Sequence, residues 1–108
     1  MTATLLAIYR RPEGGDEALQ AFLRRYHEEH MPLIAKVPGL RGSVTENVAH
    51  HYAGDDIVMV TRMEFDDRAA VDAGMTSDEM RAAGRNLREI APGLLTLVAL
   101  EESESSAG

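Results

Sequence analysis

Several residue types are scarce or missing in this 108-residue sequence, and each absence limits what the protein can be. Without cysteine the chain can form no disulfide, bind no metal through thiolates and use no cysteine nucleophile. Basic residues are in the minority, 11 against 18 acidic ones, and the formal charge of -7 repels nucleic acid and anionic membranes. The opening apolar run is too short to cross a bilayer and precedes its arginines, unlike a signal peptide. We therefore expect a cytoplasmic protein that binds neither nucleic acid nor membrane.

The spacing of apolar residues changes along the chain and predicts alternating strands and helices. Asp16 is predicted to cap the first helix, and Pro32 to kink or break that helix before one further turn. Thr76 and Glu79 have the spacing of a capping box at the start of the last helix. The predicted elements are strands over 4–10, 40–52, 56–65 and 94–101, with a hairpin connection at 53–55, and helices over 16–37, 66–73 and 76–91.

This order predicts a ferredoxin-like βαββαβ fold of the α+β class, an antiparallel four-stranded sheet with two helices on one face. Residues 1–101 form the predicted domain, and the acidic tail over 102–108 is predicted to be disordered. The segments IVMV (57–60) and LLTLVAL (94–100) are apolar on both faces, although two helices can cover only one. A second copy of the sheet would cover the other face, so we expect a twofold homodimer joined through sheet faces.

Two parts of the chain resemble proteins of the EthD family, in the dimeric α/β-barrel superfamily. The first, over 9–42, has an Arg-Pro-Glu-Gly turn, then His30 followed by Met-Pro-Leu, then Pro38-Gly-Leu; the second covers 57–67 and 76–87. The resemblance implies the dimeric α/β barrel and a choice among cofactor-independent monooxygenases, polyketide cyclases, lactone isomerases and haem-degrading enzymes. It also implies an oxidoreductase label, because EthD-type proteins are often described as reductases or as accessories to oxygenase systems.

Two histidines, His27 and His30, lie three residues apart on the first predicted helix. A helical zinc site needs histidines four residues apart, and Glu28 and Glu29 are expected on the solvated side, so we expect no metal site. His30 occupies the apolar stripe next to Tyr26. It is either a core histidine satisfied by a carbonyl or a tyrosine, or a general acid and base. His27 flanks the apolar stripe and is expected at its boundary. If the stripe borders a site, Tyr26 and His27 are expected to contact the substrate.

Four more side chains are candidates for a site. Tyr9 ends the first strand, either as a rim residue or as a donor to an enolate oxygen. Asn47 and Arg41 lie on the polar side of the second strand, which is either a solvated edge or the wall of a cleft. In a cleft, Asn47 could polarise a carbonyl and Arg41 could hold an anionic group. Arg62 interrupts an apolar strand and either pairs with a carboxylate such as Glu46 or binds substrate.

Two hypotheses of different classes remain. The first is an enzyme without a cofactor that binds a small hydrophobic carbonyl compound, aromatic or polyketide-like, between the first helix and the sheet. His30 would move the proton, and Tyr9 or Asn47 would stabilise the developing oxyanion. The second is a dimeric protein without catalysis, which binds a small molecule or assists a degradation or biosynthesis pathway.

Overall fold

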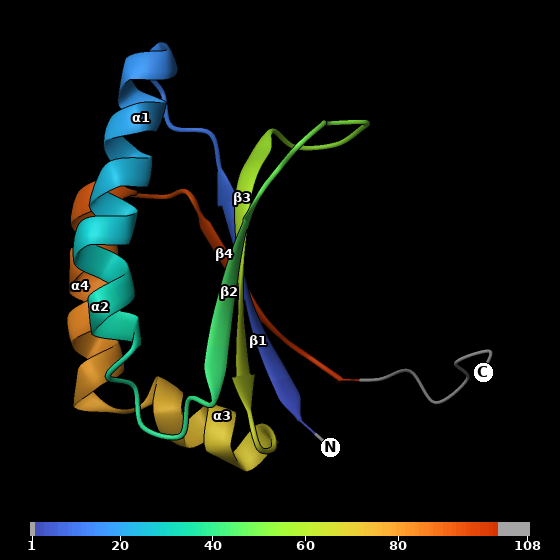
Figure 1. Cartoon of the computed structure of the whole chain (residues 1–108), viewed down its shortest axis with the longest axis vertical. Coiled ribbons are helices and arrows are strands. Elements are labelled where there is room, and N and C mark those ends of the chain that lie inside the picture. The colour runs from blue at the N-terminus through green and yellow to red at the C-terminus, as the bar shows by residue number, and fades with distance from the viewer. Residues whose placement is uncertain (1, 102–108) are drawn as a thin grey trace.

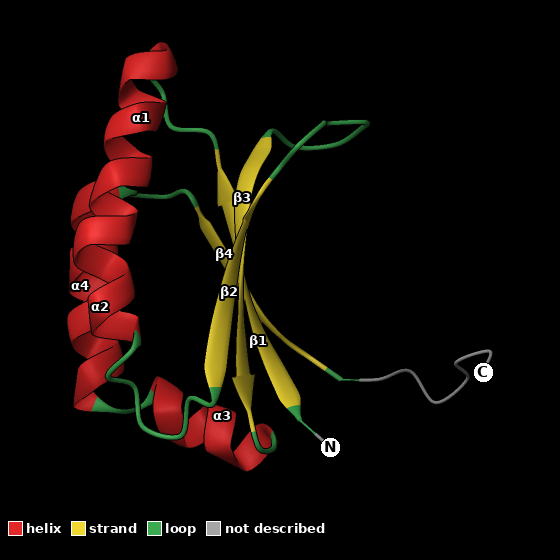
Figure 2. Ribbon diagram, in the orientation of Figure 1, coloured by secondary structure: helices red, strands yellow, loops and turns green. Residues whose placement is uncertain are grey.

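The computed structural model describes residues 2–101, so the tail expected over 102–108 lies outside the described residues. Four strands form one antiparallel sheet in the order β2-β3-β1-β4, and the long helices pack against one of its faces (Figures 1 and 2). The predicted ferredoxin-like α+β fold is confirmed. The elements are β1 (Ala3–Arg10), α1 (Gly15–Arg25), the π-helical turn η1 (Tyr26–His30), α2 (Met31–Ile34), β2 (Gly42–Asn47), β3 (Ile57–Phe65), α3 (Arg68–Met75), α4 (Asp78–Ile90) and β4 (Leu95–Leu100).

The first helix continues past Pro32, where the sequence predicted a kink or a break. Helix α1 runs directly into η1, in which the backbone N–H of Met31 donates to the carbonyl of Tyr26, five residues earlier. Because proline has no N–H and its ring crowds the preceding turn, the wider π turn admits Pro32 without ending the helix. The helix then stops at Ile34, earlier than the predicted end at Val37. No helix of the described chain is both long and apolar enough to span a membrane.

The second strand is shorter than predicted. Strand β2 ends at Asn47, and residues 48–56 form a long loop to β3, so the compact hairpin connection expected at 53–55 is wrong. The last pair of the ladder joins Asn47 to Met59. Beyond it the chain leaves the helix layer (Figure 1), and Tyr52, with 90% of its surface exposed, packs only edge-on against the ring of His50 among the described residues. Periodicity alone cannot show where the covering layer stops.

Helix α4 begins one residue later than the predicted capping box requires. The hydroxyl of Ser77 accepts a hydrogen bond from the backbone N–H of Met80 at 3.1 Å and so caps the helix. The Thr76 hydroxyl instead turns back and donates to carbonyls in the last turn of α3. Asp67 caps α3, where its side chain accepts from the backbone N–H of Ala70 at 2.8 Å.

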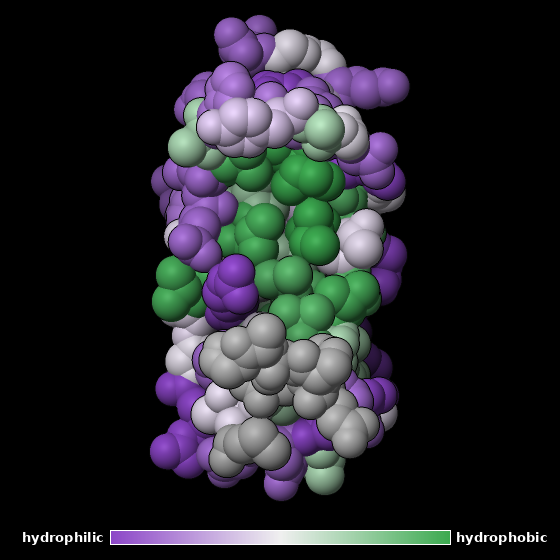
Figure 3. All heavy atoms as spheres, turned by 90° about the vertical axis from the view of Figure 1, so that its right-hand side faces the viewer, coloured by the Kyte–Doolittle hydropathy of each residue, from purple (hydrophilic) through white to green (hydrophobic). Residues whose placement is uncertain are grey.

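The two faces of the sheet differ. Buried side chains face the helices, from Leu5, Ala7 and Tyr9 of β1 and from Met59, Thr61, Met63 and Phe65 of β3. The alternate side chains form an apolar band on the opposite face (Figure 3), where Val44, Val98 and Leu100 are 57%, 38% and 43% exposed. Arg62 lies on this face and pairs with Glu46 at 3.3 Å, which is one of the two alternatives that the sequence left open. The helices therefore leave one apolar face of the sheet uncovered.

Gly74, buried in α3, leaves no room for a side chain. A Cβ at this position would lie 3.0 Å from the ring of Phe65, 3.3 Å from the carbonyl oxygen of Pro38 and 3.3 Å from Val37. We expect G74A to lower the free energy of unfolding by about 1–3 kcal/mol through overpacking, although alanine is the better helix former. Urea denaturation followed by circular dichroism measures the change.

The matched control is G84A in α4. A Cβ on Gly84 would meet only the flexible end of Arg88, at 3.7 Å. We expect this substitution to raise the free energy of unfolding by about 0.5–1 kcal/mol, because alanine loses less backbone freedom on folding. If both variants gained stability equally, the close contact with Phe65 would not be the constraint on residue 74.

Candidate functional site

A cavity of about 370 Å³ lies between the sheet and α4. Helix α4 supplies more of its wall than the first helix, which the sequence had favoured. Tyr9 and His30 reach the cavity from the core, and three arginines of α4 line it as well. The remaining lining is apolar or glycine and consists of Leu5, Ala7, Ile34, Met63, Met75, Met80, Ala83, Gly84, Leu87, Leu95 and Leu97. An apolar pocket of this size with a few convergent polar groups is typical of small-molecule sites.

The turn η1 places Tyr26 and His30 toward the sheet. The two residues are 1% and 3% exposed, and their ring centroids are 5.1 Å apart. The predicted position of His30 in the apolar stripe is confirmed. His27 is exposed and packs edge-on against Tyr26, with ring centroids 5.6 Å apart. Of the two histidines in the motif, therefore, His30 alone borders the cavity.

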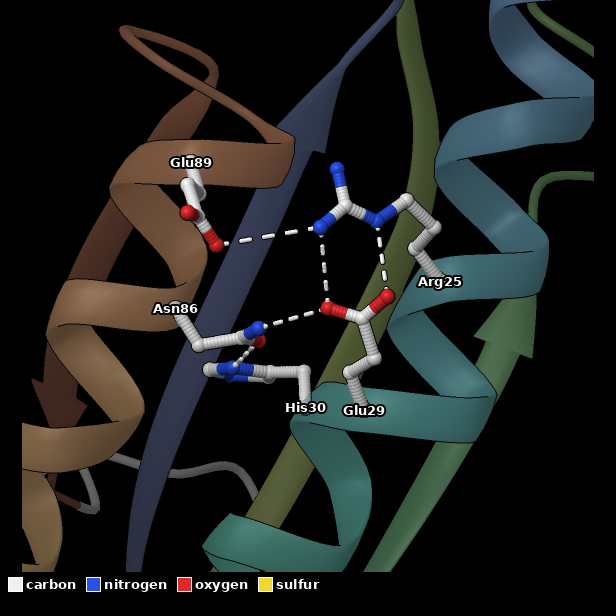
Figure 4. A network of polar contacts seen from close by, with 5 residues as sticks. All are labelled: Arg25, Glu29, His30, Asn86 and Glu89. Carbon is white, nitrogen blue, oxygen red and sulfur yellow. Dashed lines mark hydrogen bonds and ion pairs between the residues drawn. The ribbon is translucent and has the colours of Figure 1, made fainter.

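A chain of polar contacts runs from the first helix to α4 behind His30 (Figure 4). Arg25 donates to the Glu29 carboxylate from Nε at 2.7 Å and from Nη2 at 3.1 Å, and its Nη2 lies 3.7 Å from Glu89. The amide nitrogen of Asn86 donates to Glu29 at 3.0 Å. Asn86 Oδ1 lies 3.2 Å from His30 Nδ1. Glu29 was expected in solvent with Glu28, but it is half-buried because it joins the two helices.

The chemistry of this network determines which nitrogen of His30 carries the proton. An ionised carboxylate can only accept, so the NH₂ group of Asn86 faces Glu29 and its Oδ1 faces His30. Since Oδ1 can only accept as well, His30 Nδ1 is the donor. In the neutral imidazole the lone pair then lies on Nε2.

Burial lowers the pKa of His30, and this effect outweighs the hydrogen bonds to Asn86 and to the backbone of Ala83, which raise it. His30 is therefore neutral at pH 7. The neighbouring Arg25 holds the pKa of the Glu29 carboxyl below its usual value, mainly through their hydrogen bond, so Glu29 stays ionised. The result is a neutral base beside the cavity, connected through one amide to a fixed negative charge.

Tyr9 is a core residue and not the rim residue that one interpretation of the sequence favoured. It is 2% exposed, and its ring packs edge-on against that of Tyr26 at 5.1 Å between centroids. Burial, with a further contribution from Tyr26, raises the pKa of Tyr9. The Tyr9 hydroxyl therefore stays protonated. The Tyr26 hydroxyl bonds to Thr61, which in turn lies 3.0 Å from the hydroxyl of Thr45 on β2.

The structure does not bring the other sequence candidates to this cavity. Asn47 lines a separate cavity with His50 and His51 from the loop over 48–56. Arg41 is exposed and pairs with Asp66 at 3.1 Å, and Arg62 lies on the opposite face of the sheet. Within residues 2–101 no three side chains of the metal-ligating types come together. Of the residues that the sequence proposed for a site, His30 and Tyr9 thus remain in the lining of this cavity.

Asn86 was missed in the sequence. It precedes the buried Leu87 and follows the buried Ala83 by three positions, so it flanks the apolar stripe of α4. A polar residue at such a boundary is a signal for a contact between helices, but the sequence does not show which helix lies beside it.

No family model and no curated protein matches the sequence. Among solved structures, an ethyl tert-butyl ether D (EthD) family protein from Bacillus halodurans is 33% identical, covers 95% of this chain and 100% of its own, and has a TM-score of 0.82. This chain belongs to the EthD family. The resemblance found in the sequence is thereby confirmed.

More distant solved structures share the fold of this EthD protein. A dimeric protein of unknown function from Bacteroides fragilis is 20% identical over 94% of this chain and 96% of its own, with a TM-score of 0.67. A hydroxynitrile lyase from Passiflora edulis is 8% identical over 96% and 95%, with a TM-score of 0.69. At these identities the likeness concerns the fold alone.

The assigned tautomer of His30 can be tested directly. We expect the neutral ring to carry its proton on Nδ1, as reported by the ¹⁵N shifts of the ring nitrogens in long-range heteronuclear NMR spectra. In N86L this preference should disappear, and the pKa of His30 should fall further because a bond that favours the cation is lost.

The matched control is N47L, because Asn47 lines a different cavity. It should leave the ring shifts and the pKa of His30 as they are in the wild type. A wild-type ring protonated on Nε2 would contradict the assignment of Asn86 as the acceptor.

Proposed function

We propose that this EthD protein is an enzyme that removes a proton from a carbon next to the carbonyl group of a small hydrophobic substrate, aromatic or polyketide-like, without a bound cofactor. The proposal is based on one observation, a buried neutral imidazole that borders an apolar cavity and whose Nδ1 is engaged by Asn86. Oxidoreductase, monooxygenase and cyclase reactions can all begin with this step, and the proposal concerns the step they share.

In this mechanism His30 is the base, and Nε2 accepts the proton. Its lowered pKa keeps it neutral and ready at pH 7. The imidazolium that forms keeps its Nδ1–H bond to Asn86, whose amide is oriented by the ionised Glu29. The hydrogen bond to Asn86, which raises the pKa of His30, favours the cation at the moment it forms.

Tyr9 is the proposed donor to the carbonyl oxygen, on which negative charge develops as the proton leaves carbon. It lines the same cavity as His30, and its raised pKa keeps the hydroxyl protonated. A donor held in an apolar pocket stabilises an oxyanion more than it would in water. Asn47, the other candidate for this role in the sequence, lines a separate cavity and has no part in the proposal.

The alternative is a binding or accessory protein without catalysis. One observation favours it, since His30 and Asn86 satisfy each other and can be explained as a structural bridge between helices. The fold does not decide the question, because the neighbours named above include both a lyase and a protein of unknown function.

The enzyme hypothesis predicts catalysed exchange at carbon. With 2-tetralone as a probe in D₂O, NMR should show the wild type replacing the protons next to the carbonyl faster than buffer alone. The rate should be constant above neutral pH and fall as the pH drops through the pKa of His30, which lies below its ordinary value of about 6.5. H30Q should exchange at the buffer rate, because it has no titrating base.

H27Q is the matched control, since His27 is exposed and does not line the cavity. It should exchange the probe at the wild-type rate. Undiminished exchange in H30Q would rule out His30 as the base, and binding of 2-tetralone with no acceleration by the wild type would favour the binding protein.

We also propose that two copies associate through the face of the sheet that the helices leave uncovered. The strands that are apolar on both faces suggested this assembly. The Bacteroides fragilis neighbour is described as dimeric, which supports this assembly for a chain of the same fold. Val44, Val98 and Leu100 are exposed on this face. Each Å² of apolar surface that leaves water contributes about 25 cal/mol, so covering the band favours association.

Sedimentation at micromolar concentration should therefore give the mass of a dimer, and V98D should give a monomer, because a buried unpaired charge is costly. A73D introduces the same charge at an exposed site on α3 and should remain dimeric. A monomeric wild type would exclude the proposed interface.

A further inference from the structure

Three arginines form a row on α4 at the edge of the cavity. Arg81, Arg85 and Arg88 are four and three residues apart, so they lie on one side of the helix, and all three line the cavity. All three arginines are exposed, whereas Tyr9 and His30, which line the same cavity, are buried. The cavity is therefore apolar and neutral in its interior and positively charged along one edge.

Two of these arginines are not neutralised. Arg81 pairs with Asp78, but Arg85 and Arg88 form no ion pair with any residue between 2 and 101. Arg85 does contribute weakly, after Arg81, to the lowered pKa of Asp78. Six of the 11 basic residues pair with a carboxylate of the described chain, and of the five that do not, Arg85 and Arg88 lie together at this cavity.

The backbone of α4 leaves space for this row. Gly84 lies inside the 13-residue helix, where glycine is unfavourable, and it lines the cavity between Arg81 and Arg88. The Nη1 atom of Arg88 would lie 3.7 Å from a Cβ at residue 84. The guanidinium of Arg88 thus extends back over the glycine to the edge of the cavity.

We infer that the ligand of this cavity carries a carboxylate, which Arg85 and Arg88 bind while its apolar body fills the interior. Guanidinium groups match the planar carboxylate and donate to it in pairs. The net charge of -7 does not oppose this locally, because at physiological salt exposed charges act over about 8 Å only. The inference rests on the proposed function in that it defines the substrate class of the same cavity, an acid with a hydrophobic body and a carbonyl group.

The test compares two ligands of equal size, 2-naphthoate and the neutral 2-naphthamide, by isothermal titration calorimetry on the full chain. We expect the wild type to bind the carboxylate at least about tenfold more tightly, as charge-assisted hydrogen bonds typically provide. The preference should weaken as the salt concentration is raised. In the double variant R85Q/R88Q it should disappear, while binding of 2-naphthamide stays at the wild-type level.

R24Q is the matched control, because Arg24 is an exposed arginine of α1 that also forms no ion pair within the described chain and does not line the cavity. It should keep the full preference for 2-naphthoate. Equal binding of the two ligands, binding of neither, or a preference that survives in R85Q/R88Q would each overturn the inference. Binding does not depend on proton transfer, so a preference for the carboxylate would stand even if H30Q exchanged 2-tetralone normally, and the proposed function would then fail alone.

Discussion

A four-stranded sheet covered by helices on one side only is the constraint on which the rest of this structure depends. All the long helices must share a single face, so the layer between helices and sheet contains both the core and the cavity. A polar group placed in this layer needs a partner within it, since a buried group without a hydrogen bond costs about 1–3 kcal/mol. On the opposite face the part of the chain over residues 2–101 forms no such layer, and its alternate side chains stay open to solvent in a single copy.

The contacts behind His30 follow from that requirement. Arg25 and Glu29 are 40% and 38% exposed at their side chains, so solvent screens their ion pair and it contributes little stability. Its effect is on orientation. A carboxylate held by Arg25 forces the amide of Asn86 into one orientation, and that amide then determines the tautomer of His30. The π turn contributes by keeping Pro32 within a continuous helix, so that Tyr26 and His30 stay on the buried side.

The sequence predicted the order of elements because the period of apolar residues is a direct consequence of burial, and it predicted the position of His30 for the same reason. The sequence-based prediction failed where two different local structures satisfy the same sequence pattern. The loss of a hydrogen bond at Pro32 indicated a break, but a π turn relieves the same clash. Thr76 and Ser77 are both good caps, and only the path of the chain selects the second. Asn86 and the arginines of α4 could not be assigned from the sequence, because polar residues on a helix look alike until its neighbours are known.

Helix α4 separates two kinds of charge. On the side that faces the first helix, Asn86 and Glu89 meet Arg25 and Glu29, and these contacts orient the amide that bonds to His30. On the side that borders the cavity, Arg85 and Arg88 leave positive charge without a carboxylate. Ala83 and Leu87 line the same cavity as Arg85 and Arg88, so a bound anion could place its apolar body against this buried stripe and its carboxylate at the edge. If the only role of these residues were to bridge two helices, the contacts of Asn86 and Glu89 would be enough, and Arg85 and Arg88 at the cavity would not be needed.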